Sequence, residues 1–263
     1  MRGLRLPGGA SLLRADDTAD GSTPMADDSP VFAEIPLGPL SAASRGEEPA
    51  RAGGYLLAVV PTTAGQYWHY LVDQGLRGVP APRLHGFLAA AGTGLRTTPE
   101  GVIVLDEQWA ALPVTCVTWY GAVAYSEWLG SRIGMTCRLP SAAEWQYAAA
   151  GAAGLRWALG DDFDRKTYAP TATGPRPVGG TPANAFGLRD MTGNVFEWCA
   201  DPLVTDDASG HVALGSRVIK GGAYTVRNPE SFENATAFTA DELSTVPYIG
   251  FRVLCPSPIQ VPS

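Results

Sequence analysis

Glycine and proline together make up about a fifth of this chain, with 31 Gly and 22 Pro in 263 residues. Proline does not continue a helix interior and glycine favours turns, so this composition favours short elements joined by irregular loops. Hydrophobic residues are 45% of the chain, which is enough to build one substantial core. The sequence therefore predicts a globular domain that is rich in loops.

The charge of the chain excludes one large class of partner. The formal net charge is -7 and the isoelectric point is near 5.0. Affinity for a nucleic-acid backbone comes from clustered Lys and Arg, so we expect no DNA or RNA partner. No stretch approaches the roughly 20 apolar residues that cross a bilayer, so we expect no membrane partner. We expect a cytoplasmic protein, with secretion left open.

The chain divides into a leader, one domain and a short tail. Residues 1–30 are rich in Ala, Asp, Gly, Ser and Thr, which predicts a flexible leader. We expect one domain over residues 31–258 and a short tail at residues 259–263. Apolar residues flanked by turn residues indicate strands within residues 31–40, 54–60, 195–198, 217–220 and 249–254.

Three stretches predict capped helices. The first follows Thr62 or Thr63, and its buried face contains Tyr67, Tyr70 and Leu71. The second follows Thr118, and the residues at helical spacing are Val123, Ala124, Trp128 and Leu129. The third begins at Ser141, which forms a Ser-x-x-Glu capping box with Glu144. Beyond residue 151 regular patterns fade.

Four cysteines are spread along the chain without any CxxC spacing: Cys116, Cys137, Cys199 and Cys255. Zinc cages need clustered Cys and His, so the spacing does not predict one. We expect buried free thiols and leave one disulfide open. The three histidines, His69, His85 and His211, share no short motif with one another or with a carboxylate, and we expect surface or packing roles for them.

Three blocks of sequence together resemble one family. They are RLPSAAEWQYAAAG (residues 138–151), NAFGLRDMTGNVFEWCAD (184–201), and VIKGGAY (218–224) followed by GFRVL (250–254). Their order and spacing are similar to those of the formylglycine-generating enzyme, or sulfatase-modifying factor, family. Weaker matches extend the resemblance over residues 31–258. It implies an α+β fold related to C-type lectins, with short, mostly antiparallel sheets, a few helices and much irregular loop.

The resemblance also identifies what this chain lacks. In the active formylglycine generators, two cysteines that follow the glycine turn hold copper, which suits soft thiolate ligands. The matching positions here are Val226 and Ser231. The resemblance therefore implies that no copper thiolate site forms and that the chain does not generate formylglycine. A relative in ergothioneine synthesis holds iron through a histidine-rich motif that this chain lacks, and iron is left open.

A second metal is implied by the block that contains Asn194 and Glu197. In the family an equivalent loop binds calcium through an Asn side chain, carbonyl groups and an acidic group, all of which are hard oxygen ligands. Asn194 and Glu197 match that pattern, so Ca²⁺ is a possible cofactor. The alternative is that Asn194 caps a turn and Glu197 accepts hydrogen bonds from buried backbone donors.

The loop over residues 224–248 is the predicted ligand-binding surface, because it mixes aromatic anchors with adaptable polar groups. Its candidate residues are Tyr224, Arg227, Asn228, Glu230, Phe232, Asn234 and Tyr248. The alternative is an ordinary loop whose aromatic side chains fold inward. We therefore expect a recognition domain for an unidentified protein or small molecule, or, as the alternative, a metal-dependent oxidoreductase of a biosynthetic pathway.

Overall fold

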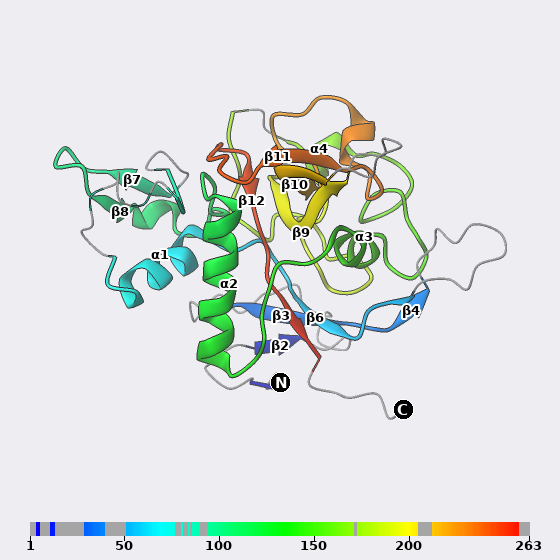
Figure 1. Cartoon of the computed structure of the whole chain (residues 1–263). Coiled ribbons are helices and arrows are strands. Elements are labelled where there is room, and N and C mark those ends of the chain that lie inside the picture. The colour runs from blue at the N-terminus through cyan, green and yellow to red at the C-terminus, as the bar shows by residue number, and fades with distance from the viewer. Residues whose placement is uncertain are drawn as a thin grey trace.

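The computed structural model describes residues 4–5, 11–13, 29–39, 51–76, 80, 84, 86–89, 94–170, 173–204 and 212–257. These residues form an α+β fold with short strands, three helices of nine residues or more, and long irregular connections. Figure 1 shows two sheets at different levels of the molecule, with α2 running along the height between them. The predicted fold class is confirmed.

One sheet has five strands in the order β1-β2-β3-β6-β13. Its strands are β1 (Leu4–Arg5), β2 (Ser11–Leu13), β3 (Val31–Ile35), β6 (Tyr55–Ala58) and β13 (Leu254–Pro256). Strand β6 lies between β3 and β13 and pairs antiparallel with both. All four of its residues are buried, which agrees with the strand predicted within residues 54–60.

Part of the expected leader belongs to this sheet. Strand β2 pairs parallel with β3, with Leu12 opposite Phe32, and the Leu12 side chain is buried. Burial of an apolar residue beside an existing strand stabilises this short segment, and composition alone gave no sign of it. The rest of residues 1–28, apart from β1, lies outside the described residues.

The other large sheet has four strands in the order β11-β10-β9-β12. Strands β9 (Phe196–Val204) and β10 (Val212–Lys220) form its antiparallel centre, with β11 (Phe238–Asp241) beside β10 and β12 (Ile249–Gly250) parallel to β9. Two further ribbons pair β4 (Gly38–Pro39) with β5 (Arg51–Ala52) and β7 (Leu95–Thr97) with β8 (Ile103–Leu105).

The three predicted helices form, each at its predicted cap. Helix α1 (Ala64–Asp73) begins after Thr63, α2 (Trp119–Ile133) after Thr118, and α3 (Ala142–Ala150) after Ser141. The capping box of Ser141 and Glu144 is present, and α1 has an equivalent box. The short elements are α4 (Arg165–Tyr168), η4 (Glu107–Trp109) and η5 (Pro229–Phe232).

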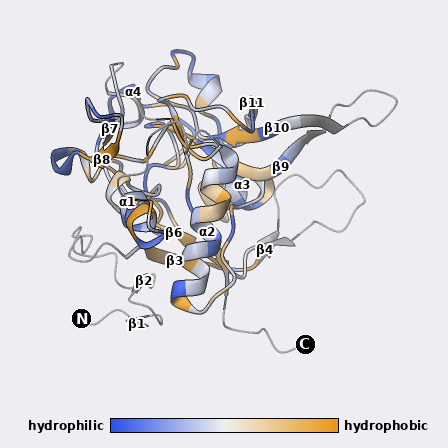
Figure 2. Ribbon diagram, turned by 60° about the vertical axis from the view of Figure 1, so that its left-hand side comes forward, coloured by the Kyte–Doolittle hydropathy of each residue, from blue (hydrophilic) through white to orange (hydrophobic). Residues whose placement is uncertain are grey.

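The buried apolar residues that the structure describes form two large clusters, both of which include residues of the two main sheets, and a small third cluster around Trp157 and Phe232. Helices α1 and α2 bury an aromatic group in which Tyr67 stacks on Tyr125 with ring centroids 5.7 Å apart. Helix α3 packs on the other large cluster, where Trp145 is fully buried. Figure 2 shows apolar stretches within β9 and β10, whereas the loop beside β8 is hydrophilic. The buried face of α2 is turned from the predicted one, because Ala122, Tyr125 and Leu129 are buried whereas Val123 and Ala124 are only partly covered.

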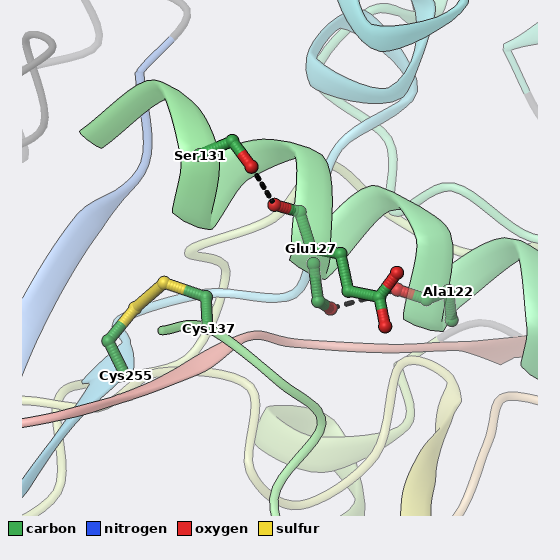
Figure 3. The surroundings of a disulfide bond; sticks show 6 residues. Ala122, Glu127, Ser131, Cys137 and Cys255 are labelled. Atoms are coloured by element: carbon green, nitrogen blue, oxygen red, sulfur yellow. Dashed lines mark hydrogen bonds between the residues drawn. A yellow bond between two sulfur atoms is a disulfide. The ribbon is translucent and has the colours of Figure 1, made fainter. Parts of the chain in front are cut away.

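Two cysteines form a disulfide, so the expectation of four free thiols was wrong for Cys137 and Cys255. They are 118 residues apart in sequence, and their Cα atoms are 4.4 Å apart. Figure 3 shows the bridge beside the end of α2 that contains Ser131. The bridge joins the segment after α2 to β13, where Arg138 and Leu254 also exchange two backbone hydrogen bonds. Cys116 and Cys199 are buried and form no disulfide.

Among the described residues, no helix has the length and apolar character that crossing a membrane requires.

Candidate functional site

The site is built on a sharp turn at the end of β10. Gly221 and Gly222 both have left-handed backbone angles, with φ of 96° and 77°. A Cβ on Gly222 would lie 2.4 Å from the Phe232 ring, so only glycine is accommodated there. The turn directs the chain from the sheet into the 224–248 loop, and the Tyr224 amide donates to the Asn194 carbonyl. The start of the loop is thereby fixed to the core.

Two tyrosines and a thiol gather where this loop leaves and re-enters the sheet. The Tyr224 hydroxyl donates to the Pro247 carbonyl at 3.3 Å. Burial raises the pKa of Tyr224, and the nearby Cys116 thiol and Tyr248 hydroxyl raise it further. Cys116 has a left-handed φ of 57°, which is uncommon for a residue with a side chain, and burial raises the pKa of its thiol to about 11. The thiol is therefore protonated at neutral pH.

The N-terminal end of α2 holds the second half of the loop. The Arg217 guanidinium donates to Glu242 at 2.7 Å and stacks over the Trp119 ring at 3.9 Å. The Tyr120 hydroxyl donates to the other oxygen of Glu242, and the Trp119 amide donates to the Glu242 carbonyl. These contacts fix the turn after β11 against α2. The sequence analysis did not identify Tyr120 as a site residue. Its position outside the predicted apolar stripe of α2 could have indicated that this aromatic side chain is exposed.

Large apolar side chains remain exposed on this anchored backbone. Tyr120 is 43% exposed, Phe238 is 40% exposed and Leu243 is 59% exposed, while Tyr224 and Tyr248 are half-buried. Phe238 contacts Phe196, whose amide donates to the Tyr248 carbonyl. We call these residues the aromatic face, and its members are Tyr120, Tyr224, Phe238, Leu243 and Tyr248.

The structure separates the candidate loop residues into two groups. Arg227, Asn228 and Glu230 are exposed beside Tyr224. Phe232 and Asn234 instead point inward: Phe232 is fully buried beside Phe163, and the Asn234 side chain donates to the Leu155 carbonyl. For these two residues, the inward-folding alternative describes the structure, because the Gly222 turn and the segment at 155–157 pack directly against them.

The two residues matched to a calcium loop are already bonded within the protein. The Asn194 side-chain oxygen accepts from the Arg176 amide at 2.9 Å, and its nitrogen donates to the Arg176 carbonyl. Glu197 forms a bidentate pair with Arg252 at 2.7 Å on both contacts, and it also accepts from the Trp145 indole. Both side chains therefore already have partners within the protein, and a calcium ion would compete with the Arg252 guanidinium for Glu197. Calcium binding stays a prediction.

Arg252 is the basic partner in that pair, and all of its guanidinium nitrogens are bonded. Besides Glu197 it donates to the carbonyls of Ala58, Val59 and Arg189. Arg252 therefore has a structural role as a fully buried partner of Glu197. Arg138 likewise pairs with Glu144 at 2.7 Å, at the protein surface.

The positions that match the family's copper ligands hold a half-buried Val226 and a partly covered Ser231. Cys199 lies in the core cluster under α3, and Cys255 is in the disulfide. Within the described ranges, no group of three or more His, Cys, Asp or Glu side chains is arranged to hold a metal ion. The chemistry available among the described residues of this site is that of aromatic rings, the guanidinium groups of Arg217 and Arg227, amide and carboxylate groups, and the protonated Cys116 thiol.

Comparison with known proteins identifies relatives of this chain. Serine/threonine-protein kinase Pkn1 of Chlamydia trachomatis is 41% identical over 136 residues, which cover 48% of this chain and 21% of the kinase. The formylglycine-generating enzyme of Streptomyces coelicolor is 35% identical over 137 residues, which cover 43% of this chain and 42% of the enzyme. The chain thus spans about a fifth of the kinase and less than half of the enzyme.

A solved structure and a family model cover nearly the whole domain. The crystal structure of CarF superposes with a TM-score of 0.64 at 20% identity and covers 88% of this chain and 99% of CarF, which supports the fold. The sequence model of the family described as "Sulfatase-modifying factor enzyme 1-like domain" matches residues 4–256. The chain therefore belongs to the sulfatase-modifying factor enzyme 1-like family.

Proposed function

We propose that this chain is a recognition domain of the family that binds a protein or a small molecule through the aromatic face, and that it does not generate formylglycine. The observation that carries the proposal is the exposure of Tyr120, Phe238 and Leu243 on a backbone fixed by buried contacts. Exposed aromatic and aliphatic side chains grouped in this way mark interaction surfaces.

The anchoring of the face lowers the cost of binding. An interface loop that must be ordered on association loses side-chain and backbone entropy, whereas this loop is held before any partner arrives. The Glu242 network fixes one end of it, and backbone bonds from Cys116 to Val246 and from Tyr224 to Asn194 fix the rest. The exposed Arg227 and Glu230 then supply charges that could set the orientation of a partner.

The residues at the positions of the family's copper ligands support the proposal that the chain does not generate formylglycine. Oxidation of a substrate thiol by copper needs two converging sulfur ligands, and Val226 and Ser231 supply none. Similarity to Pkn1 supports the proposal of a recognition domain, because a protein named for kinase activity carries a segment of this kind within a much longer chain. A recognition domain is a natural component of such a chain.

Binding by matched variants tests the proposal. The wild-type protein and a Tyr120→Ala/Leu243→Ser variant are immobilised and exposed to extracts of the source cell, and retained proteins and small molecules are quantified by mass spectrometry. The control is Leu37→Ala/Trp109→Ala, which removes two large side chains of similar exposure elsewhere. We expect retention to fall at least tenfold for the first variant only. Equal retention by the wild type and both variants would contradict the proposal.

Metal analysis separates this function from an oxidoreductase. The purified protein is assayed for copper, iron and calcium by inductively coupled plasma mass spectrometry. Copper or iron at one equivalent per chain, lost on Cys116→Ala substitution, would replace recognition by metal-dependent oxidation as the proposed function. Calcium alone, or none of these metals, is the result that recognition predicts.

A further inference from the structure

A pocket of about 320 Å³ lies between α1 and α2, at the C-terminal half of α2, whereas the aromatic face meets the N-terminal end of that helix. Its volume is at the lower end of the range for small-molecule sites. Tyr125, Leu129 and Ile133 contribute apolar walls, and Trp128, Asp73 and Arg132 contribute polar groups. The pocket is thus independent of the proposed recognition surface.

Asp73 lies at a position where the helix itself disfavours a carboxylate. It is the last residue of α1, and the C-terminal end of a helix carries partial negative charge. Two donors from α2 compensate: the Trp128 indole donates to Asp73 Oδ2 at 2.7 Å and Arg132 Nη1 donates to Oδ1 at 3.2 Å. A carboxylate and a guanidinium therefore stand side by side at the pocket.

Both charged groups remain accessible to a ligand. The Asp73 side chain is 45% exposed and the Arg132 side chain is 52% exposed. Arg132 uses one terminal nitrogen for Asp73 and lies 5.3 Å from the Trp128 ring centroid, so the rest of its planar fork is available. Each oxygen of Asp73 can accept a further hydrogen bond.

The sign of the charges decides the class of ligand. A simple anion would pair with Arg132 but would be repelled by Asp73. A simple cation would pair with Asp73 but would be repelled by Arg132. A zwitterion satisfies both, because its carboxylate can bind the guanidinium while its ammonium binds the carboxylate. The apolar walls then accept an uncharged side chain. These requirements together describe an α-amino acid with an aromatic or branched aliphatic side chain.

We propose that the pocket between α1 and α2 binds a free α-amino acid with an apolar side chain, with its carboxylate on Arg132 and its ammonium on Asp73. Neither the family resemblance nor the proposed recognition function assigns a ligand to this place. The pocket adds a small-molecule site to a domain whose recognition surface lies elsewhere.

Three probes with the same apolar body test the charge argument. L-phenylalanine, 3-phenylpropionate and phenethylamine are titrated into the ¹⁵N-labelled protein, and the Trp128 indole N–H resonance is followed after assignment with Trp128→Phe. We expect a saturable shift with phenylalanine, with a dissociation constant of about 1 mM or below, and affinities at least tenfold weaker for both single-charge analogues. Equal binding of all three, or no saturable shift, would overturn the proposal.

Variants distinguish the pocket from the rest of the surface. Arg132→Gln and Asp73→Asn each remove one charge and are expected to weaken phenylalanine binding about tenfold. Val72→Phe narrows the pocket without touching either charge and should also weaken binding. Arg156→Gln breaks a distant exposed ion pair with Glu233 and should change nothing. Unfolding temperatures confirm that every variant is folded, and undiminished binding by all three pocket variants would contradict the site.

Discussion

Glu197 on β9 and Arg252 after β12 form a bidentate ion pair that is almost completely shielded from solvent. The Trp145 indole of α3 binds the same carboxylate, so this pair joins the four-stranded sheet, the C-terminal segment and a helix at one point. The carbonyl groups of Ala58, Val59 and Arg189 accept the remaining guanidinium protons. Glu197, which matches the family's calcium loop, therefore forms with Arg252 an internal junction of the fold.

Replacing Arg252 by Met is expected to lower the free energy of unfolding by about 3 to 5 kcal/mol, because it leaves Glu197 charged and unpaired in the interior. Urea denaturation followed by tryptophan fluorescence measures the loss. Arg138→Met is the control, since its pair with Glu144 lies at the surface and should contribute less than about 1 kcal/mol. Similar losses in the two variants would contradict the interior role of Arg252.

Replacing Cys137 and Cys255 together by Ala should lower the free energy of unfolding by about 4 kcal/mol, since the bridge closes a long loop in the unfolded chain. Denaturation of the oxidised protein, the dithiothreitol-reduced protein and the double variant measures this. Reduction should reproduce the effect of the substitutions. If reduction leaves the midpoint of wild-type unfolding unchanged, the bridge does not stabilise the fold.

Gly222→Ala should destabilise the protein by about 2 to 4 kcal/mol, because a left-handed φ and a clash with Phe232 act together. Gly215→Ala is a matched control: its φ is also left-handed at 85°, but no atom lies within 4 Å of the added carbon. The control should cost about 1 kcal/mol. Thermal and urea unfolding of both variants separates the steric contribution from the backbone contribution.

Lys220 predicts a specific pH dependence. Burial lowers the pKa of this lysine to about 8 in the folded protein, whereas the pKa of an unfolded lysine is near 10.5. Between these values the unfolded chain binds more protons, so this group makes stability rise with pH from about 8 to 10.5. Wild-type stability should therefore gain up to about 3 kcal/mol relative to Lys220→Met over that window.

The measurement for Lys220 is a set of urea titrations of both proteins at several pH values. The buried thiols Cys116 and Cys199 have raised pKa values, which act in the opposite direction at high pH, but they are common to both proteins. The difference between the two curves therefore reports Lys220 together with its electrostatic coupling to the Cys199 thiol. A pH-independent difference would show that Lys220 stays charged in the folded state.

Local signals in the sequence were sufficient to predict where the three long helices begin. Thr63, Thr118 and Ser141 cap helices because side-chain oxygens and the first amides lie within a few residues of one another. The disulfide depends on an approach of residues 118 positions apart, for which no local pattern exists. Burial of Leu12 similarly depends on a neighbouring strand that begins 19 residues later.

The candidate site was predicted only in outline. The 224–248 loop does present aromatic groups, but composition could not say that Phe232 turns inward, because the Gly222 turn that contacts it is a tertiary feature. Tyr120 and Leu243 belong to the aromatic face because the Tyr120 hydroxyl binds Glu242, which is 122 residues away in sequence and precedes Leu243. Hydrophobic periodicity describes one element at a time, so it could not predict a surface that α2 and the 224–248 loop form together.

The final strands of the domain impose an order on its assembly. Strand β12 forms one edge of the four-stranded sheet, and β13 forms one edge of the five-stranded sheet. Arg252 lies between these two strands, and Cys255 lies in β13. During synthesis these residues emerge from the ribosome after all their partners. Until they do, Glu197 lacks its counter-ion and Cys137 lacks its sulfur partner. Both sheets, the buried ion pair and the disulfide can therefore be completed only after this segment has been synthesised.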